Sequence, residues 1–562
     1  MDARTQQSRG KFSVALGICV LLWLVSLFAV HPLGNFPLND DWSFGQAVKV
    51  LLENHDFRPG GWTAMPLVTN VLWGSLFCLP SGFSFIALRI STLVAALLGM
   101  LGLYWLLKRS RAPEWFAVTA SLLLGFNPVF YPLSCSFMTD VPFTTLTIFA
   151  ALFLLKNLEN GADRDLIIGT IFVLLATLSR QLALAVPLAF AIVSFFKYGC
   201  NRSKLWRAIL PAVIGIIALM LFQHWMASTG RLSSMYNKKS GELARALANP
   251  LHTLPEFAHN LYVCLLYLGL FLSPLSFCVL AAVWSAQKKK AQLIFASSLW
   301  VLLLAGFCYR SRGMFMPLST HVLQESGIGP ITLRDVAILQ LNLPPELPPT
   351  FWKIVTLISV LGAVALLTII GIILCDALPK LRSRTLSGNH TVALFSLACV
   401  AIYLAPLLAT TFFDRYLIVA IPFLAAAMAG VCPLPKPTAK ILAPAGAVLA
   451  GAMLYAVCGT HDYLGWNTAR WTATNELMAN ERVKPGEIDG GFEFNATYFF
   501  NPDFDPLSSK KSWWWVQSDT YMISFGPVPD YEVIKEYPYT RWLLPGRGII
   551  VASKKSDTPS AP

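Results

Sequence analysis

Long apolar runs recur along most of this chain and restrict what it can fold into. Stretches of 16 to 24 mostly apolar residues follow one another from Lys11 to Cys458. A helix needs about 20 such residues to cross the hydrocarbon core of a bilayer. The composition agrees, because 55% of the residues are hydrophobic and only 13% are charged, whereas a soluble domain has roughly a quarter of its residues charged. We therefore expect an all-α polytopic membrane protein.

The apolar runs predict about 13 transmembrane helices. The first run has full span length and no small-residue cleavage site, so we expect it to remain as an anchor. An odd number of spans puts the two termini on opposite sides of the membrane. The predicted spans are 12–30, 84–107, 115–133, 141–156, 165–179, 182–197, 206–224, 261–284, 291–309, 352–375, 391–409, 413–431 and 440–458.

Basic residues mark one side of the predicted bundle. With 13 spans, the short links on one side carry 20 Lys and Arg residues, and the positive-inside rule makes that side cytoplasmic. We expect a multi-pass protein of the plasma (inner) membrane with its N-terminus in the cytoplasm. The outer face then receives loops 31–83, 134–140, 225–260 and 310–351. The same distribution accounts for the net charge of +13, so no nucleic-acid partner is expected.

The chain changes character after the last apolar run. Residues 459–562 are polar and aromatic, with β-like runs at 531–534 and 548–553 that are bounded by glycine-containing turns. We predict two domains, a transmembrane domain over 1–458 and a small extracytoplasmic α/β domain over 459–562. The aromatic side chains of Trp513 to Trp515 suit stacking against sugars, and equally suit anchoring at a membrane surface.

Two adjacent carboxylates open the first predicted outer loop. Asp40 and Asp41 precede the apolar positions of 44–52, a pattern too short to span, which predicts an amphipathic helix in the membrane interface. A second short apolar stretch, 65–79, predicts another interfacial helix. One acid at a helix N-terminus is often only a cap. Two neighbouring carboxylates raise the pKa of one of them and provide a candidate general base for an acceptor hydroxyl.

More charged residues are predicted at the outer membrane boundary. Asp140 begins a helix with an early proline, where an acid is costly and indicates function, although a helix cap is the alternative. Arg180 lies at the turn between two short spans. It suits a phosphate through paired hydrogen bonds, or it extends to lipid headgroups. Asp414 and Arg415 begin the twelfth span, where an internal salt bridge is the alternative to a functional role.

Metal and nucleotide chemistry have no signal in the sequence. The histidines lack metal-ligand spacing, and Walker, Rossmann and serine-elbow patterns are absent. We predict neither a metal nor a cofactor. The outer loop 310–351 carries Arg310, Arg312 and His321 among glycines and prolines, and its length suits a lid over a substrate.

Four short motifs, taken in their order along the chain, carry a family resemblance. They are Asn39-Asp40-Asp41-Trp42, Ala87 to Thr92, Thr139 to Pro142, and Arg415-Tyr416 through Pro422. In their order, and in the side of the membrane on which each is predicted, they resemble the GT-C membrane glycosyltransferases. The resemblance is to the protein O-mannosyltransferase and aminoarabinose-transferase group of glycosyltransferase family 39 in particular. The resemblance extends over much of residues 1–430. The chain departs from it at 58–62, where many relatives have His-Pro-Pro-Leu, and at Asp41, where Glu is common.

The resemblance implies a GT-C fold and inverting transfer of a sugar from a polyprenyl-phosphate donor to an acceptor hydroxyl. The acceptor is a glycan, a lipid or a protein, and membrane lipids surround the enzyme. Asp40 is then the general base. The other candidate site residues are Asp41 and Asp140 (catalytic), Arg180 and Arg415 (donor phosphate), and Arg58, Arg310, Arg312 and Tyr416 (possible acceptor or lid contacts). We expect Asp140 and Arg180 to face Asp40 across a cavity that opens to the outer leaflet.

A transporter or lipid flippase is the main alternative. Such a protein usually has internal repeats, broken helices and ionisable groups near mid-span. Here the rare charges gather at one face, which favours an enzyme. A scaffold role is a third alternative. The sequence specifies neither the sugar nor the acceptor.

Overall fold

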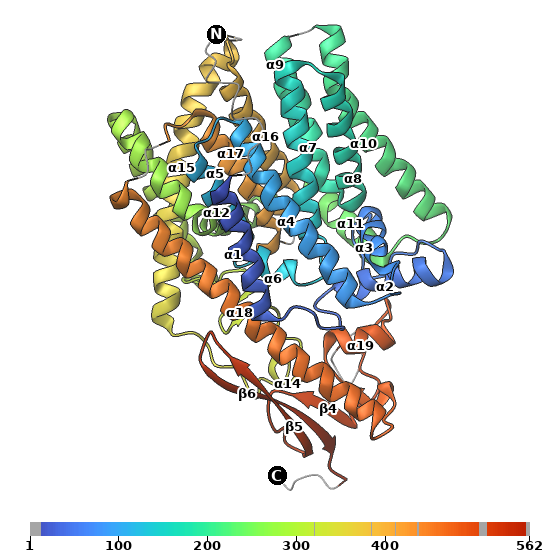
Figure 1. Ribbon diagram of the computed structural model, residues 1–562. Helices are drawn as coiled ribbons and strands as arrows, with labels where there is room; N and C mark the ends of the chain where they lie inside the picture. Colours follow the sequence, from blue (N-terminus) through green and yellow to red (C-terminus); the bar gives the residue numbers. More distant parts are fainter. Residues whose placement is uncertain are drawn as a thin grey trace.

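The protein is a bundle of long helices with a small β-sheet at one end (Figure 1). The computed structural model describes residues 13–199, 201–319, 321–383, 385–410, 412–434, 438–504 and 514–557. The α-helices are α1 (Val14–Val30), α2 (Asp41–Asn54), α3 (Val68–Cys78), α4 (Phe85–Arg109), α5 (Glu114–Gly125), α6 (Phe130–Ser134), α7 (Asp140–Asn160), α8 (Asp163–Ser179), α9 (Ala185–Tyr198), α10 (Arg202–Ser228), α11 (Ser234–Ala248), α12 (Pro250–Ala286), α13 (Lys288–Tyr309), α14 (Arg334–Ala337), α15 (Pro349–Arg382), α16 (Gly388–Leu408), α17 (Ala420–Val431), α18 (Ala439–Ala479) and α19 (Phe492–Phe499).

Short 3-10 helices and strands complete the described chain. The 3-10 helices are η2 (Gln181–Leu184), η3 (Arg310–Arg312), η4 (Asp414–Val419) and η5 (Pro485–Glu487). The strands are β1 (Leu323–Gln324), β2 (Gly327–Ile328), β3 (Ile488–Asp489), β4 (Tyr521–Ser524), β5 (Tyr531–Arg541) and β6 (Gly546–Lys555).

The predicted spans all coincide with helices. Within the described residues, 10 helices are long and apolar enough to cross a membrane. The remaining predicted spans correspond to α1, α5 and α8, which have 17, 12 and 17 residues. The predicted span 115–133 is interrupted because α5 ends at Gly125 and Asn127 then accepts hydrogen bonds from the amides of Val129 and Phe130. The fold is that of a multi-pass helical membrane protein, as predicted.

The first long loop contains the two short helices expected at the membrane interface. Helix α2 begins at Asp41 and buries most of its first two turns, and α3 follows over Val68–Cys78. Two short spans were predicted to meet near Arg180. Helix α8 indeed ends at Ser179, and Arg180 is extended, with φ −145° and ψ 132°, before η2 begins.

Helices α12 and α15 pack closely because both present glycine at their contact. A Cβ on Gly362 would overlap the backbone oxygen of Gly269, and a Cβ on Gly269 would overlap the backbone nitrogen of Ala363. Beside them, the Ser359 hydroxyl donates to the Leu266 carbonyl at 2.6 Å. Small residues that let two backbones approach are the usual means of association inside a membrane, where lipid provides no hydrophobic driving force.

The C-terminal sheet packs on the end of the longest helix. Its strand order is β3-β4-β6-β5, with β3 and β4 parallel and the other pairs antiparallel. Helix α18 has 41 residues and contacts both β5 and β6 (Figure 1). It passes without a break through residue 458, where the sequence places a domain boundary, so that boundary stays a prediction.

We predict that Gly362→Ala destabilises the protein by about 1–3 kcal/mol, because the new methyl group must force α12 and α15 apart. The measurement is thermal unfolding of purified protein in nanodiscs. Gly446→Ala in α18 is the control, since a Cβ there meets nothing within 4 Å, and it is expected to leave the melting temperature unchanged or to raise it. Equal melting temperatures for Gly362→Ala and the wild type would contradict the packing account.

Candidate active site

Asp40 forms a largely buried ion pair with a residue far along the chain. Its Oδ2 lies 3.1 Å from Nη2 of Arg415, and its Oδ1 accepts a hydrogen bond of 2.8 Å from the indole of Trp62. The Asp40 side chain is 16% exposed and that of Arg415 is 7% exposed. Asp40 precedes the first residue of α2 but makes no side-chain cap bond. Its carboxylate therefore faces Arg415 and is not used as a helix cap.

A second ion pair lies beside the first. Arg180 Nη1 is 2.9 Å from Asp140 Oδ1, and Arg180 Nε donates to the Thr139 hydroxyl at 2.8 Å. Both charged side chains are at least 94% buried, with exposures of 6% and 1%. The extended backbone at Arg180, between α8 and η2, lets the side chain point toward the first residue of α7. Asp140 does not cap α7 through its side chain either.

The ring of Tyr416 brings the two pairs together. The guanidinium carbons of Arg180 and Arg415 lie 5.7 Å and 5.6 Å from its centroid, within cation–π range. Asp140 also interacts electrostatically with Arg415. The structure thus joins Asp40, Asp140, Arg180 and Arg415, which come from four separate segments, into one cluster that we call the acid–arginine cluster.

The acid–arginine cluster leaves polar atoms without hydrogen-bond partners. Neither Asp140 oxygen receives a well-directed hydrogen bond from the described residues, although Arg180 lies 2.9 Å away, and Arg415 Nε also has no acceptor there. Buried polar groups are nearly always satisfied in folded proteins. The described residues thus leave a carboxylate and a guanidinium nitrogen of this cluster without a hydrogen-bond partner.

Asp41 has a different environment from Asp40. It is fully buried, and its two oxygens accept from the backbone amides of Leu38 and Phe137 at 2.5 and 3.0 Å. Burial raises the pKa of Asp41 to about 7, while Arg89 and the two amide hydrogen bonds act in the opposite direction. Asp41 therefore fastens the first outer loop to the segment before α7 and places Asp40 opposite Asp140.

The loop 310–351 packs against Asp414 and places His321 beside the acid–arginine cluster. The Asp414 carboxylate accepts from the amides of Val322 and Leu323, so it does not form an internal salt bridge with the neighbouring Arg415. The His321 ring packs on Phe413, with centroids 4.6 Å apart. Burial lowers the pKa of His321 well below its ordinary value, and Arg415 acts in the same direction while Asp140 opposes it. His321 is therefore a neutral imidazole beside the cluster.

The C-terminal segment also reaches the first outer loop. Glu493 in α19 accepts from the Asn39 amide at 2.9 Å with one oxygen, and from Arg470 at 2.8 Å with the other. Thr332 donates to the same second oxygen at 2.7 Å. Glu493 and Arg470 are both fully buried. This pair fixes the residue that immediately precedes Asp40.

Aromatic side chains cover the outer side of Asp40. Trp62, which donates to Asp40, and Trp42 pack against a group from the C-terminal segment that consists of Phe492, Phe499, Phe500, Phe504, Trp514 and Trp515. Within this group Trp514 and Trp515 contact other rings, whereas Trp513 lies outside the described residues. Trp62 therefore links Asp40 to an aromatic cluster that the first outer loop and the C-terminal segment share.

Three arginines that the sequence suggested for acceptor or lid contacts pair elsewhere. Arg58 lies 3.6 Å from Asp56 and its side chain is 65% exposed. Arg312 pairs with Glu256 at 2.7 Å, and Arg310 donates to the Phe307 carbonyl in the last turn of α13. Within the described chain, none of these arginines contacts the acid–arginine cluster. The described residues also hold no group of three or more His, Cys, Asp or Glu able to bind a metal ion.

The sequence did not predict that three residues contact this site. His321, expected only as part of a lid loop, and Glu493 reach it from distant segments, whereas Trp62 belongs to the same outer loop as Asp40. For Glu493 one local sign was present, an acid within an otherwise aromatic and apolar stretch. A buried acid of this kind needs a partner, but nothing in the sequence indicates that the partner is Arg470.

The fold and the cluster define a multi-pass helical membrane protein with paired acids and arginines at one end. Residues 65–227 match the model of the dolichyl-phosphate-mannose-protein mannosyltransferase family. The matched stretch includes Asp140 and Arg180, whereas Asp40 and Arg415 lie outside it. The resemblance to GT-C membrane glycosyltransferases is thereby confirmed, and the match supports a glycosyltransferase that uses a lipid-linked donor. None of the curated proteins matches the chain.

Solved structures with a similar chain course have low TM-scores. ArnT from Cupriavidus metallidurans bound to undecaprenyl phosphate is 12% identical, with a TM-score of 0.40 over 96% of this chain and 97% of that chain. The Archaeoglobus fulgidus oligosaccharyltransferase in its apo form is 15% identical, with a TM-score of 0.40 over 90% of this chain and 62% of that chain. Likeness at this level carries no conclusion about the site.

We predict that Glu493→Gln destabilises the protein by about 3 kcal/mol, because it leaves the fully buried Arg470 charge unpaired. Glu256→Gln is the matched control. That acid also pairs with an arginine, but its side chain is 52% exposed, so the expected cost is below about 1 kcal/mol. Thermal unfolding in nanodiscs measures both. Similar losses of stability in the two variants would show that the buried ion pair stabilises the protein no more than the exposed one.

Asp41 gives a prediction about pH. Its folded pKa of about 7 lies above the ordinary value of 3.8, so the stability it contributes is fully present below pH 3.8 and is lost as pH rises to about 7. The change in the free energy of unfolding over this pH range is about 4 kcal/mol at most. We therefore expect the wild type to lose stability relative to Asp41→Asn across this range. Melting temperatures measured from pH 4 to pH 8 test this, and a constant difference between the two proteins contradicts it.

Proposed function

We propose that this protein transfers a sugar from a polyprenyl-phosphate donor to an acceptor hydroxyl, with inversion at the anomeric carbon and with Asp40 as the general base. The observation that carries the proposal is the acid–arginine cluster, which combines a carboxylate that is not used as a cap with two guanidinium groups in a largely buried place. The family match over residues 65–227 supports the class of donor.

The proposed reaction is a single displacement. The acceptor hydroxyl gives its proton to an oxygen of Asp40 while its own oxygen attacks the anomeric carbon. The bond from that carbon to the phosphate oxygen breaks on the opposite face, and the polyprenyl phosphate leaves with the bonding electrons. Attack opposite to the leaving group inverts the configuration. A positioned base of this type contributes about 10²–10⁴-fold to a rate.

The two arginines are proposed to receive the negative charge that develops on the leaving phosphate. Guanidinium groups bind phosphate oxygens through paired hydrogen bonds. Arg415 still has Nε free of an acceptor among the described residues, and Arg180 is oriented by Thr139 and Asp140. Fixed cations in a water-poor site stabilise such charge strongly. Tyr416, between the two groups, is proposed to hold them at a constant spacing.

The neighbouring acids have separate proposed roles. Asp41 is a positioning residue, because its carboxylate is occupied by two backbone amides. Asp140 orients Arg180 and offers oxygens to sugar hydroxyls. Arg58, Arg310 and Arg312 are proposed to meet the acceptor only if the outer loops move, because each pairs elsewhere here. The plasma (inner) membrane location, with the C-terminal segment on the extracytoplasmic side, is likewise part of the proposal.

We predict that Asp40→Asn lowers kcat by at least about 100-fold, because the variant keeps the size of the side chain but removes the base. Purified protein in nanodiscs is given radiolabelled polyprenyl-phosphate sugars and membrane acceptors, and transfer is counted. Asp56→Asn is the matched control, since Asp56 is an acid of the same loop that pairs with the exposed Arg58 and with Arg231.

Full transfer by Asp40→Asn would overturn Asp40 as the base. Transport of the labelled lipid across the bilayer by the wild type, with no transfer to any acceptor, would instead favour the transporter or flippase alternative.

A further inference from the structure

A second charged site lies at the other end of the bundle. Asp140 begins α7, and the 21 residues of that helix place its last turn about 30 Å away. There, a cavity of about 470 Å³ opens between the ends of α4, α7 and α9 and the beginning of α16. We call it the Arg111 cavity; its lining includes Arg109, Arg111, Glu159, Lys197, Gly388 and Asn389.

The Arg111 cavity has an excess of positive charge. Three cationic side chains line it, against one acid, Glu159. That acid is already paired with Arg109, whose Nη2 lies 2.5 Å from it. Lys197 donates to the Leu158 carbonyl at 2.6 Å, and Arg111 forms no ion pair within the described residues. Two cations therefore have no anionic partner at contact distance in the described chain.

One buried atom points to a missing acceptor. Arg111 itself follows the end of α4 in the left-handed conformation that is usual after a helix, with φ 59° and with the amides of Arg111 and Ala112 donating to the carbonyls of Lys108 and Leu107. Arg109 Nε is buried and donates to no atom of the described residues. A buried donor without an acceptor at the wall of a cavity is usually satisfied by a ligand or a water molecule.

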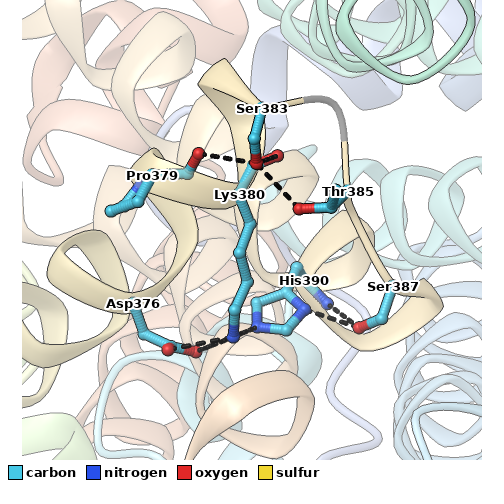
Figure 2. Close-up of polar contacts among 7 residues, drawn as sticks. All are labelled: Asp376, Pro379, Lys380, Ser383, Thr385, Ser387 and His390. Atoms are coloured by element: carbon cyan, nitrogen blue, oxygen red, sulfur yellow. Dashed lines mark hydrogen bonds and ion pairs between the residues drawn. The ribbon is translucent and has the colours of Figure 1, made fainter.

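The beginning of α16 lines this cavity. A polar network joins it to α15 (Figure 2). His390 connects two helices, because its Nε2 lies 2.9 Å from Asp376 of α15 and its Nδ1 lies 2.5 Å from the hydroxyl of Ser387, the residue before α16. Lys380 reaches both Asp376 and His390 (Figure 2). The first amides of α16, at Gly388 and Asn389, are thereby fixed at the cavity wall.

We propose that the Arg111 cavity binds a phosphate group. Arginine forks, a lysine and the amides at a helix beginning are the donors that proteins use for phosphate. A neighbouring cavity of about 440 Å³ shares Glu159 and Lys197 and adds Lys204 and Arg207, so the remainder of a larger phosphate compound has space. The phosphate belongs either to a lipid headgroup or to a free phosphate compound. This proposal does not depend on the transferase activity.

The test uses the full chain in nanodiscs of zwitterionic phosphatidylcholine. One arm titrates inorganic phosphate and follows its ³¹P resonance. The other adds short-chain phosphatidylglycerol and counts retained lipids by native mass spectrometry. We expect one saturable site in at least one arm, weakened about tenfold by Arg111→Gln and by Lys197→Gln, which each remove a charged donor. If binding saturates in just one arm, that arm identifies the source of the phosphate.

Lys290→Gln is the matched control, since it removes one exposed cation from α13 outside the cavity. It is expected to change the affinity less than twofold. Melting temperatures of the three variants confirm that each is folded. Absence of saturable binding in both arms would overturn the proposal, and so would an equal loss of affinity in Lys290→Gln, because that result indicates general attraction to a basic surface.

Discussion

The ion pair between Asp40 and Arg415 is the contact on which the arrangement of this site depends. The two residues are 375 positions apart in the sequence and both are largely buried. Taking charges out of water is expensive, and a buried pair is tolerated only when its geometry and surrounding hydrogen bonds are good. This requirement fixes the first outer loop relative to η4. Asp140 and Arg180 meet the same requirement beside it, so the cluster is balanced in charge.

Backbone amides hold the rest of the site in place. Asp41 accepts from the amides of Leu38 and Phe137, and Asp414 accepts from those of Val322 and Leu323. Each of these acids joins two loops that are distant in sequence. Glu493 does the same for Asn39 and the C-terminal segment. The segment after α18 is thus part of the wall around Asp40.

Much of the fold could be predicted from the sequence because hydrocarbon requires long apolar helices, and this signal is local. Asp40, Asp140, Arg180 and Arg415 could be selected for a related reason, since charges at membrane depth are rare and costly. Their pairing could not be predicted, because no local pattern shows that Arg415 meets Asp40. The same limit applies to His321 and Glu493. It applies as well to Arg58, which stands where the chain departs from the family pattern and which pairs with Asp56.

The charge balance of the acid–arginine cluster has a consequence for the proposed reaction. Arg415 is paired with Asp40 and Arg180 with Asp140. A phosphate that binds both arginines competes with the two carboxylates for the same guanidinium N–H groups. Under the proposed function, donor binding therefore loosens Asp40 from Arg415 and makes its oxygen available to the acceptor hydroxyl. The same substrate that brings the sugar then also prepares the base.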